Sequence, residues 1–135
     1  RDADVVCAVS SAPDPLFRPE SIAPGTHING VGSHTPSTRE IPGETMRDAR
    51  VIVDSREANL SECGDCMIPI AEGVFGPEHV SDELGQLLAG SVVGRTSDGE
   101  ITVYQSCGIA IQDVAAAAVV YARAVDAAIG THVEL

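Results

Sequence analysis

The chain has 135 residues, 44% apolar and 3% aromatic, which suits one globular domain with an aliphatic core and excludes a disordered chain. Its formal charge is −12 and its eight basic residues are all arginine, so nucleic acid and anionic membrane surfaces are not expected as partners. Because it has no lysine, it cannot itself supply a Schiff-base, P-loop or general-base lysine.

No run of about 18 apolar residues is present, and the first residues do not resemble a signal peptide, so a cytoplasmic location is expected. The chain starts with Arg1 instead of Met and reaches an apolar run at once, at Val5. We therefore interpret it as a piece of a longer protein.

Short apolar runs alternate with helical patterns along the chain. Buried strands that end in turns rich in Gly, Ser or Pro are expected at 5–9, 27–32, 51–53 and 101–104. Helices are expected at 42–49, at 56–62 with Ser55 as its N-cap, and from about 77 to 88. A long Ala- and Val-rich helix is expected at 109–129, largely buried, ending at Gly130 before a short strand at 131–133.

This alternation predicts an α/β fold with a parallel sheet and a ligand site beyond the carboxyl ends of the strands. Ser10, the turn at 32–34 and the segment 106–108 all fall at that edge. Small residues and backbone N–H groups allow the close approach of a nucleotide. The GxGxxG fingerprint and its ribose-binding acid are absent, so these residues by themselves indicate only an α/β ligand-binding domain.

The four cysteines include one pair, Cys63 and Cys66, with the CxxC spacing of a redox centre or a zinc half-site. Cys7 and Cys107 lie in apolar, strand-like runs, where buried thiols act as small hydrophobic side chains. No second CxxC or HxxxH motif supplies the remaining zinc ligands. We therefore expect no metal site and favour a structural role over a redox one.

Three ordered blocks resemble a known family. They are HINGVGSHTP with Arg39 and Glu40 (27–40), VIVDSREA (51–58) and GRTSDGEITVYQSCGIAIQDVAA (94–116). They are similar to blocks of the ornithine cyclodeaminase/mu-crystallin family. The resemblance implies that residues 1–108 form the C-terminal part of a Rossmann-like NAD(P)-binding domain. It implies that 109–135 form a helix and tail packing towards a dimerisation and substrate domain, built mostly by an N-terminal half outside this chain.

The resemblance also implies roles for single residues. The implied cofactor contacts are Ser10, Val31, Gly32, Ser33, Thr38 and Ser106, and Cys107 is the residue that faces substrate. His34 stands where ornithine cyclodeaminases and archaeal alanine dehydrogenases carry a catalytic Asp, and it is our candidate for proton transfer. The alternatives are that His34 is a solvent-facing turn residue, that 106–108 is a plain strand-to-helix turn, and that Asp54 only braces the next helix.

The implied function is NAD- or NADP-dependent oxidoreduction of small amino or imino acids, of the alanine dehydrogenase or ketimine/pyrroline-carboxylate reductase type, in a homodimer. One alternative is ornithine cyclodeaminase proper, which forms L-proline and ammonia from L-ornithine with NAD as catalytic cofactor, although His34 at the Asp position disfavours it. Another is a non-catalytic ligand-binding relative or structural fragment. The phosphate-binding glycines and the substrate-gripping Lys and Arg are expected outside this chain, so the chain alone is expected to be inactive.

Overall fold

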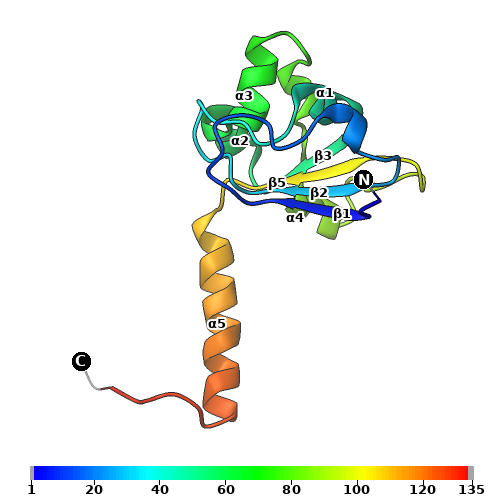
Figure 1. Cartoon of the computed structure of the whole chain (residues 1–135). Helices are drawn as coiled ribbons and strands as arrows, with labels where there is room; N and C mark the ends of the chain where they lie inside the picture. The colour runs from blue at the N-terminus through cyan, green and yellow to red at the C-terminus, as the bar shows by residue number, and fades with distance from the viewer. Residues whose placement is uncertain (1, 134–135) are drawn as a thin grey trace.

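Five parallel strands form one sheet in the order β1-β2-β5-β3-β4 (Figure 1). The computed structural model describes residues 2–133. The strands are β1 (Val5–Ala8), β2 (His27–Gly30), β3 (Arg50–Val53), β4 (Asp82–Glu83) and β5 (Thr102–Gln105). Val103 of β5 lies opposite Ile28 on one side and Val51 on the other. The predicted α/β fold with a parallel sheet is confirmed, and four of the five strands lie where the apolar runs placed them.

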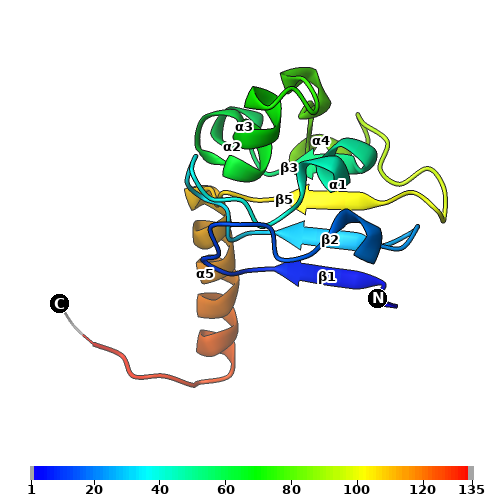
Figure 2. The ribbon, with the colours of Figure 1, turned by 45° about the horizontal axis from the view of Figure 1, so that its top comes forward.

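The connections between the strands determine which face each helix covers. The helices are η1 (Pro19–Ser21), α1 (Gly43–Asp48), α2 (Arg56–Glu62), α3 (Gly64–Ala71), η2 (Pro77–His79), α4 (Leu84–Leu88) and α5 (Ala110–Asp126). The connections from β2 to β3 and from β3 to β4 cross the sheet in one direction, and the connection from β4 to β5 returns. Because such crossovers are right-handed, α1, α2 and α3 cover one face and α4 lies on the other (Figures 1 and 2).

The core lies between the sheet and the face covered by α1, α2 and α3. Alternate residues of the central strands, such as Ile28, Val53 and Val103, point into it and are at most 1% exposed. Met46 and Cys63 pack against them from the helices. Val, Ile and Met side chains therefore fill this layer with little aromatic contribution, as the composition predicted.

The predicted continuous helix from 77 to 88 is wrong for residues 77–83, and only its last part, 84–88, is α-helical. Val80 is 1% exposed and enters the core, and the following residues Asp82 and Glu83 pair with β3 as the edge strand β4. Helix α4 therefore begins only at Leu84. Helix α3 was not predicted from the sequence, and it contains Pro69, a residue that is unusual inside a helix.

Helix α5 leaves the body of the molecule and extends away from the sheet (Figure 1). It ends at Asp126, earlier than predicted, and residues 131–133 form no strand. The expectation that this helix is largely buried is wrong within the described chain, since none of its residues is buried. Its large apolar residues are exposed, with values from 52% for Val119 to 73% for Tyr121. No helix within residues 2–133 combines the length and apolar character that a membrane span requires.

Candidate functional site

The carboxyl ends of β1, β2 and β5 meet at one edge of the sheet, because the three strands are parallel neighbours. Ser10 follows β1, the segment 31–34 follows β2, and the segment 106–108 follows β5. The predicted candidate residues are therefore brought together at one edge, which we call the strand-end edge. Three buried carboxylates hold its loops in place.

Glu40 joins the segments that follow β1 and β2. Its side chain is fully buried, and its Oε1 accepts hydrogen bonds from the backbone N–H and the hydroxyl of Ser10, at 2.5 and 2.6 Å. Its Oε2 accepts a 2.7 Å bond from the N–H of Gly32. A Cβ at Gly32 would lie 2.1 Å from the carbonyl oxygen of Ser10 and 2.4 Å from the carboxyl carbon of Glu40, so this close approach requires glycine.

Asp65, in the first turn of α3, binds the backbone of the segment that contains Glu40. Its Oδ1 accepts hydrogen bonds from the N–H groups of Glu40 and Ile41 at 2.7 and 2.9 Å. Its own N–H donates to the hydroxyl of Ser33 at 3.0 Å. Its Oδ2 is buried without a hydrogen-bond partner. Burial raises the pKa of Asp65 from 3.8 to about 7, and the negative charges of Cys63 and Glu40 act in the same direction.

Stability is therefore expected to depend on pH through Asp65. The folded state keeps this proton where the unfolded chain has lost it, so its contribution is fully present below pH 3.8 and is lost as the pH rises through about 7. Asp65→Asn, which keeps an oxygen for the two N–H groups, is expected to remove this loss. Urea titrations between these pH values measure it, with the exposed Asp14→Asn as control. An unchanged slope in Asp65→Asn would contradict the assignment.

Asp54, directly after β3, fixes the turn between β5 and α5. Its Oδ2 accepts 2.8 Å hydrogen bonds from the Ser106 hydroxyl and the Gly108 N–H. Its Oδ1 accepts from the Ser55 N–H and the Asn59 amide, each at 2.8 Å. The alternative that Asp54 only braces the next helix is therefore incomplete, because the same carboxylate reaches across the edge. Gly108 has φ of +83°, a conformation that favours glycine.

The residues predicted to contact a cofactor or substrate divide into two groups at this edge. Ser10, Val31 and His34 are exposed, and Gly32, Thr38 and Cys107 are half-buried. Ser33 is fully buried and Ser106 is 7% exposed, and both hydroxyls bond inward, to the Thr38 carbonyl and to Asp54. The placement of these two serines therefore favours shaping the loops over touching a ligand. The Nδ1–H of His34 donates to the Gly32 carbonyl at 2.8 Å, which leaves Nε2 as the free ring nitrogen.

The outward groups at this edge fit one end of a dinucleotide. Val9 and Val31 expose 64% and 41% of their surface beside Ser10, and open space surrounds the position of a Cβ on Gly108. Apolar side chains with a few small polar groups suit the flat nicotinamide ring. Arg39 pairs with Glu72 at 2.7 Å, and Arg56 donates to the Val80 carbonyl at 3.0 Å. The edge therefore fits the nicotinamide end better than the phosphates.

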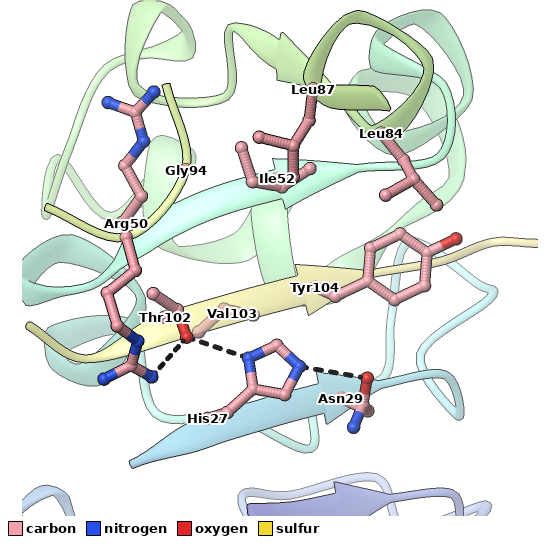
Figure 3. Close-up of a pocket in the computed structure, with 11 residues that line it drawn as sticks. His27, Asn29, Arg50, Ile52, Leu84, Leu87, Gly94, Thr102, Val103 and Tyr104 are labelled. Atoms are coloured by element: carbon pink, nitrogen blue, oxygen red, sulfur yellow. Dashed lines mark hydrogen bonds between the residues drawn. The ribbon is translucent and has the colours of Figure 1, made fainter. Parts of the chain in front are cut away.

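A cavity of about 290 Å³ lies elsewhere, on the face of the sheet that carries α4 (Figure 3). Leu84, Leu87 and Ile52 give it an apolar wall. Its polar groups bond to one another: the Thr102 hydroxyl lies 2.8 Å from Nδ1 of His27, whose Nε2 lies 3.3 Å from Oδ1 of Asn29. This internal pairing leaves few groups free for a ligand, so we place the candidate site at the strand-end edge.

The family model for the ornithine cyclodeaminase/mu-crystallin family matches residues 1–128. The chain belongs to this family. A Delta(1)-pyrroline-2-carboxylate reductase of Bacillus cereus is 40% identical over 134 residues, which are 98% of the chain and 41% of that protein. The ketimine reductase mu-crystallin of Mus musculus is 40% identical over 119 residues, 88% of the chain and 35% of that protein. The chain thus spans about two fifths of the length of these relatives.

Solved structures of family members have the same fold. The structure of Thermococcus litoralis Delta(1)-pyrroline-2-carboxylate reductase in complex with NADH and L-proline matches with a TM-score of 0.89 and 38% identity, over 98% of the chain and 41% of that structure. An archaeal alanine dehydrogenase dimer with bound NAD matches with a TM-score of 0.84 and 36% identity, over 98% of the chain and 41% of that structure. The family assignment from the three sequence blocks is confirmed.

Sequence reasoning missed the residues that build this edge of the family fold. The sequence pattern assigns no role to Glu40 or to Asp65, and it indicates only a helix brace for Asp54. The only local signal is a carboxylate that follows an apolar run or opens a helix, and many exposed acidic residues share this signal. Burial in the folded structure distinguishes Glu40, Asp54 and Asp65 from such residues, because a buried carboxylate requires several hydrogen-bond donors.

Proposed function

We propose that this chain forms the nicotinamide side of the cofactor site in an NAD- or NADP-dependent oxidoreductase of small amino or imino acids. The observation that carries the proposal is the agreement in fold, over 98% of the chain, with a reductase that holds NADH and L-proline. The strand-end edge, with its exposed Val31 and Ser10, supplies a surface of suitable shape and polarity. When bound, the cofactor supplies or accepts the hydride.

In this proposal the outward residues of the edge make the contacts. Ser10, Val31, Gly32 and Thr38 line the cofactor, and Cys107 faces the substrate. Ser33 and Ser106 position these groups from below through their inward hydrogen bonds. His34 holds or delivers a proton at Nε2, because the bond from its Nδ1–H to the Gly32 carbonyl orients the ring.

The remainder of the protein is proposed to complete the site. We propose residues 1–108 as part of a Rossmann-like domain and 109–135 as a link to a dimerisation and substrate domain. Strand β1 ends the sheet order and exposes 57% of Val5, so its outer edge can accept a further strand. The exposed apolar residues of α5 suit packing against the same remainder, in a homodimer.

The test uses the full-length protein that carries this chain. Mixing it with NADH or NADPH and a cyclic imine, pyrroline-2-carboxylate, is expected to consume the cofactor in the steady state. Conversion of L-ornithine to L-proline and ammonia with no net change in cofactor absorbance would instead identify a cyclodeaminase. Calorimetric titration that finds no binding of either cofactor would overturn the proposal and favour a non-catalytic relative.

A further inference from the structure

Two carboxylates lie directly behind the surface of the strand-end edge. Glu40 is fully buried and Asp54 is 8% exposed. Oε2 of Glu40 accepts from the N–H of Gly32 at 2.7 Å, and Oδ2 of Asp54 accepts from the N–H of Gly108 at 2.8 Å. Gly32 is half-buried and Gly108 is exposed. A single hydrogen bond therefore connects each carboxylate to a residue with solvent access at the edge.

The hydrogen-bond donors around Glu40 and Asp54 fit the ionised form of both side chains. Glu40 accepts from two backbone N–H groups and one hydroxyl. Asp54 accepts from two backbone N–H groups, the Asn59 amide and the Ser106 hydroxyl. Both oxygens of each carboxyl group are thus acceptors, and a backbone N–H can only donate. Because such bonds stabilise the charged form, each side chain carries a negative charge close to the edge.

No arginine or histidine side chain forms an ion pair with either carboxylate among residues 2–133. The arginine ion pairs of this part of the chain involve the carboxylates of Asp48, Glu72 and Asp82 instead. His34, an ionisable base at the edge, bonds to the Gly32 carbonyl. Hydrogen bonds stabilise a buried charge without cancelling it, and a protein interior screens its field less than water does. The edge therefore presents an uncompensated negative potential.

The two redox states of a nicotinamide cofactor differ in the charge of the ring. The oxidised ring carries one positive charge, the reduced ring is neutral, and the rest of the dinucleotide is the same in both states. A fixed negative charge beside the ring therefore stabilises the oxidised state relative to the reduced one. A change in this charge is expected to alter the ratio of the two affinities.

We propose that the buried carboxylates of Glu40 and Asp54 bias the strand-end edge towards the oxidised, cationic state of the nicotinamide cofactor. The inference rests on the proposed function, because it requires the nicotinamide end of the cofactor at this edge. The two side chains act through their charge from behind the backbone of Gly32 and Gly108, so they are not themselves contact residues. The same charges stabilise the positive charge that the ring gains as it gives up a hydride.

The test is calorimetric titration of the full-length protein with NAD⁺, NADH, NADP⁺ and NADPH, each alone. Wild type is compared with Glu40→Gln and Asp54→Asn, which remove one buried charge each, and circular dichroism checks that each variant is folded. Glu72→Gln is the matched control, because it removes the same charge from an exposed side chain. The Kd of the oxidised cofactor divided by that of the reduced one is expected to rise about three- to thirty-fold in Glu40→Gln. It should rise in Asp54→Asn as well and stay constant in Glu72→Gln.

The ratio of the two affinities separates charge from shape, because a loosened edge weakens the binding of both redox states alike. Asp54→Asn decides the question when Glu40→Gln does not fold, since the two carboxylates lie behind different loops. A ratio that stays at the wild-type value or falls in the folded variants overturns the inference and leaves the proposed function standing. Wild-type protein that binds neither redox state of either cofactor overturns the proposed function, and the inference with it.

Discussion

Glu40→Ala is expected to destabilise the protein by about 3–5 kcal/mol, because it removes the charged acceptor of three hydrogen bonds. The lost carboxylate accepts from the N–H and hydroxyl of Ser10 and from the N–H of Gly32. These bonds connect segments that lie 30 positions apart, so the ends of β1 and β2 would separate. Urea denaturation of the full-length protein measures the change in the free energy of unfolding.

Two further variants separate the hydrogen bonds of Glu40 from general effects. Glu40→Gln keeps one acceptor oxygen but turns an NH₂ group towards a backbone N–H, so an intermediate loss is expected. Glu72→Ala removes an exposed ion pair with Arg39 and is expected to cost less than about 1 kcal/mol. Equal losses in Glu40→Ala and Glu72→Ala would show that the Glu40 carboxylate does not hold the edge.

Asp54→Ala is expected to have an effect of similar size, about 3–5 kcal/mol, because four hydrogen bonds converge on this carboxylate. One oxygen accepts from the Ser55 N–H and the Asn59 amide, and the other from the Ser106 hydroxyl and the Gly108 N–H. The loss would free both the start of α2 and the turn between β5 and α5. Denaturation measures the stability, and hydrogen exchange of peptides spanning 102–110 measures the opening of the turn.

Asp54→Asn offers a more selective version of the same experiment. Its oxygen can keep the bonds at the start of α2, while its NH₂ group would oppose the Gly108 N–H, so faster exchange is expected mainly in the β5–α5 turn. Asp48→Asn is a matched control, because Asp48 is exposed and pairs with Arg47. Exchange in the turn that is the same in Asp54→Asn and Asp48→Asn would contradict the role given to Asp54.

Local sequence patterns predicted four strands of the sheet but not the short edge strand β4. Strands β1, β2, β3 and β5 are short apolar runs bounded by turn residues, and such runs are typical of buried parallel strands. The cap of α2 was also predicted, and the Ser55 hydroxyl accepts from the Ala58 N–H at 3.3 Å. Strand β4 has only Asp82 and Glu83, whose pairing with β3 depends on Val80 entering the core.

The sequence predicted where the candidate site lies but not which side chains hold its loops in place. Parallel strands place their carboxyl ends together, so Ser10, 31–34 and 106–108 could be grouped from the strand prediction alone. The sequence could not predict which of these side chains turn inward, because Ser33 and Ser106 resemble exposed turn serines. Cys7, predicted as a buried thiol, is exposed: Ala8, the next residue of β1, points into the core, so Cys7 points to the opposite face of the strand.

The sequence by itself determined the α/β class, the family and the order of the strands along the chain, since hydrophobic runs and turn residues act over a few positions. Only the tertiary structure decided that Glu40, Asp54 and Asp65 hold the strand-end edge and that α5 stands exposed. Hydrogen bonds such as that from Ser106 to Asp54 join residues 52 positions apart. Contacts at that separation exist only after the sheet has formed, and burial then determines which carboxylates carry the structure.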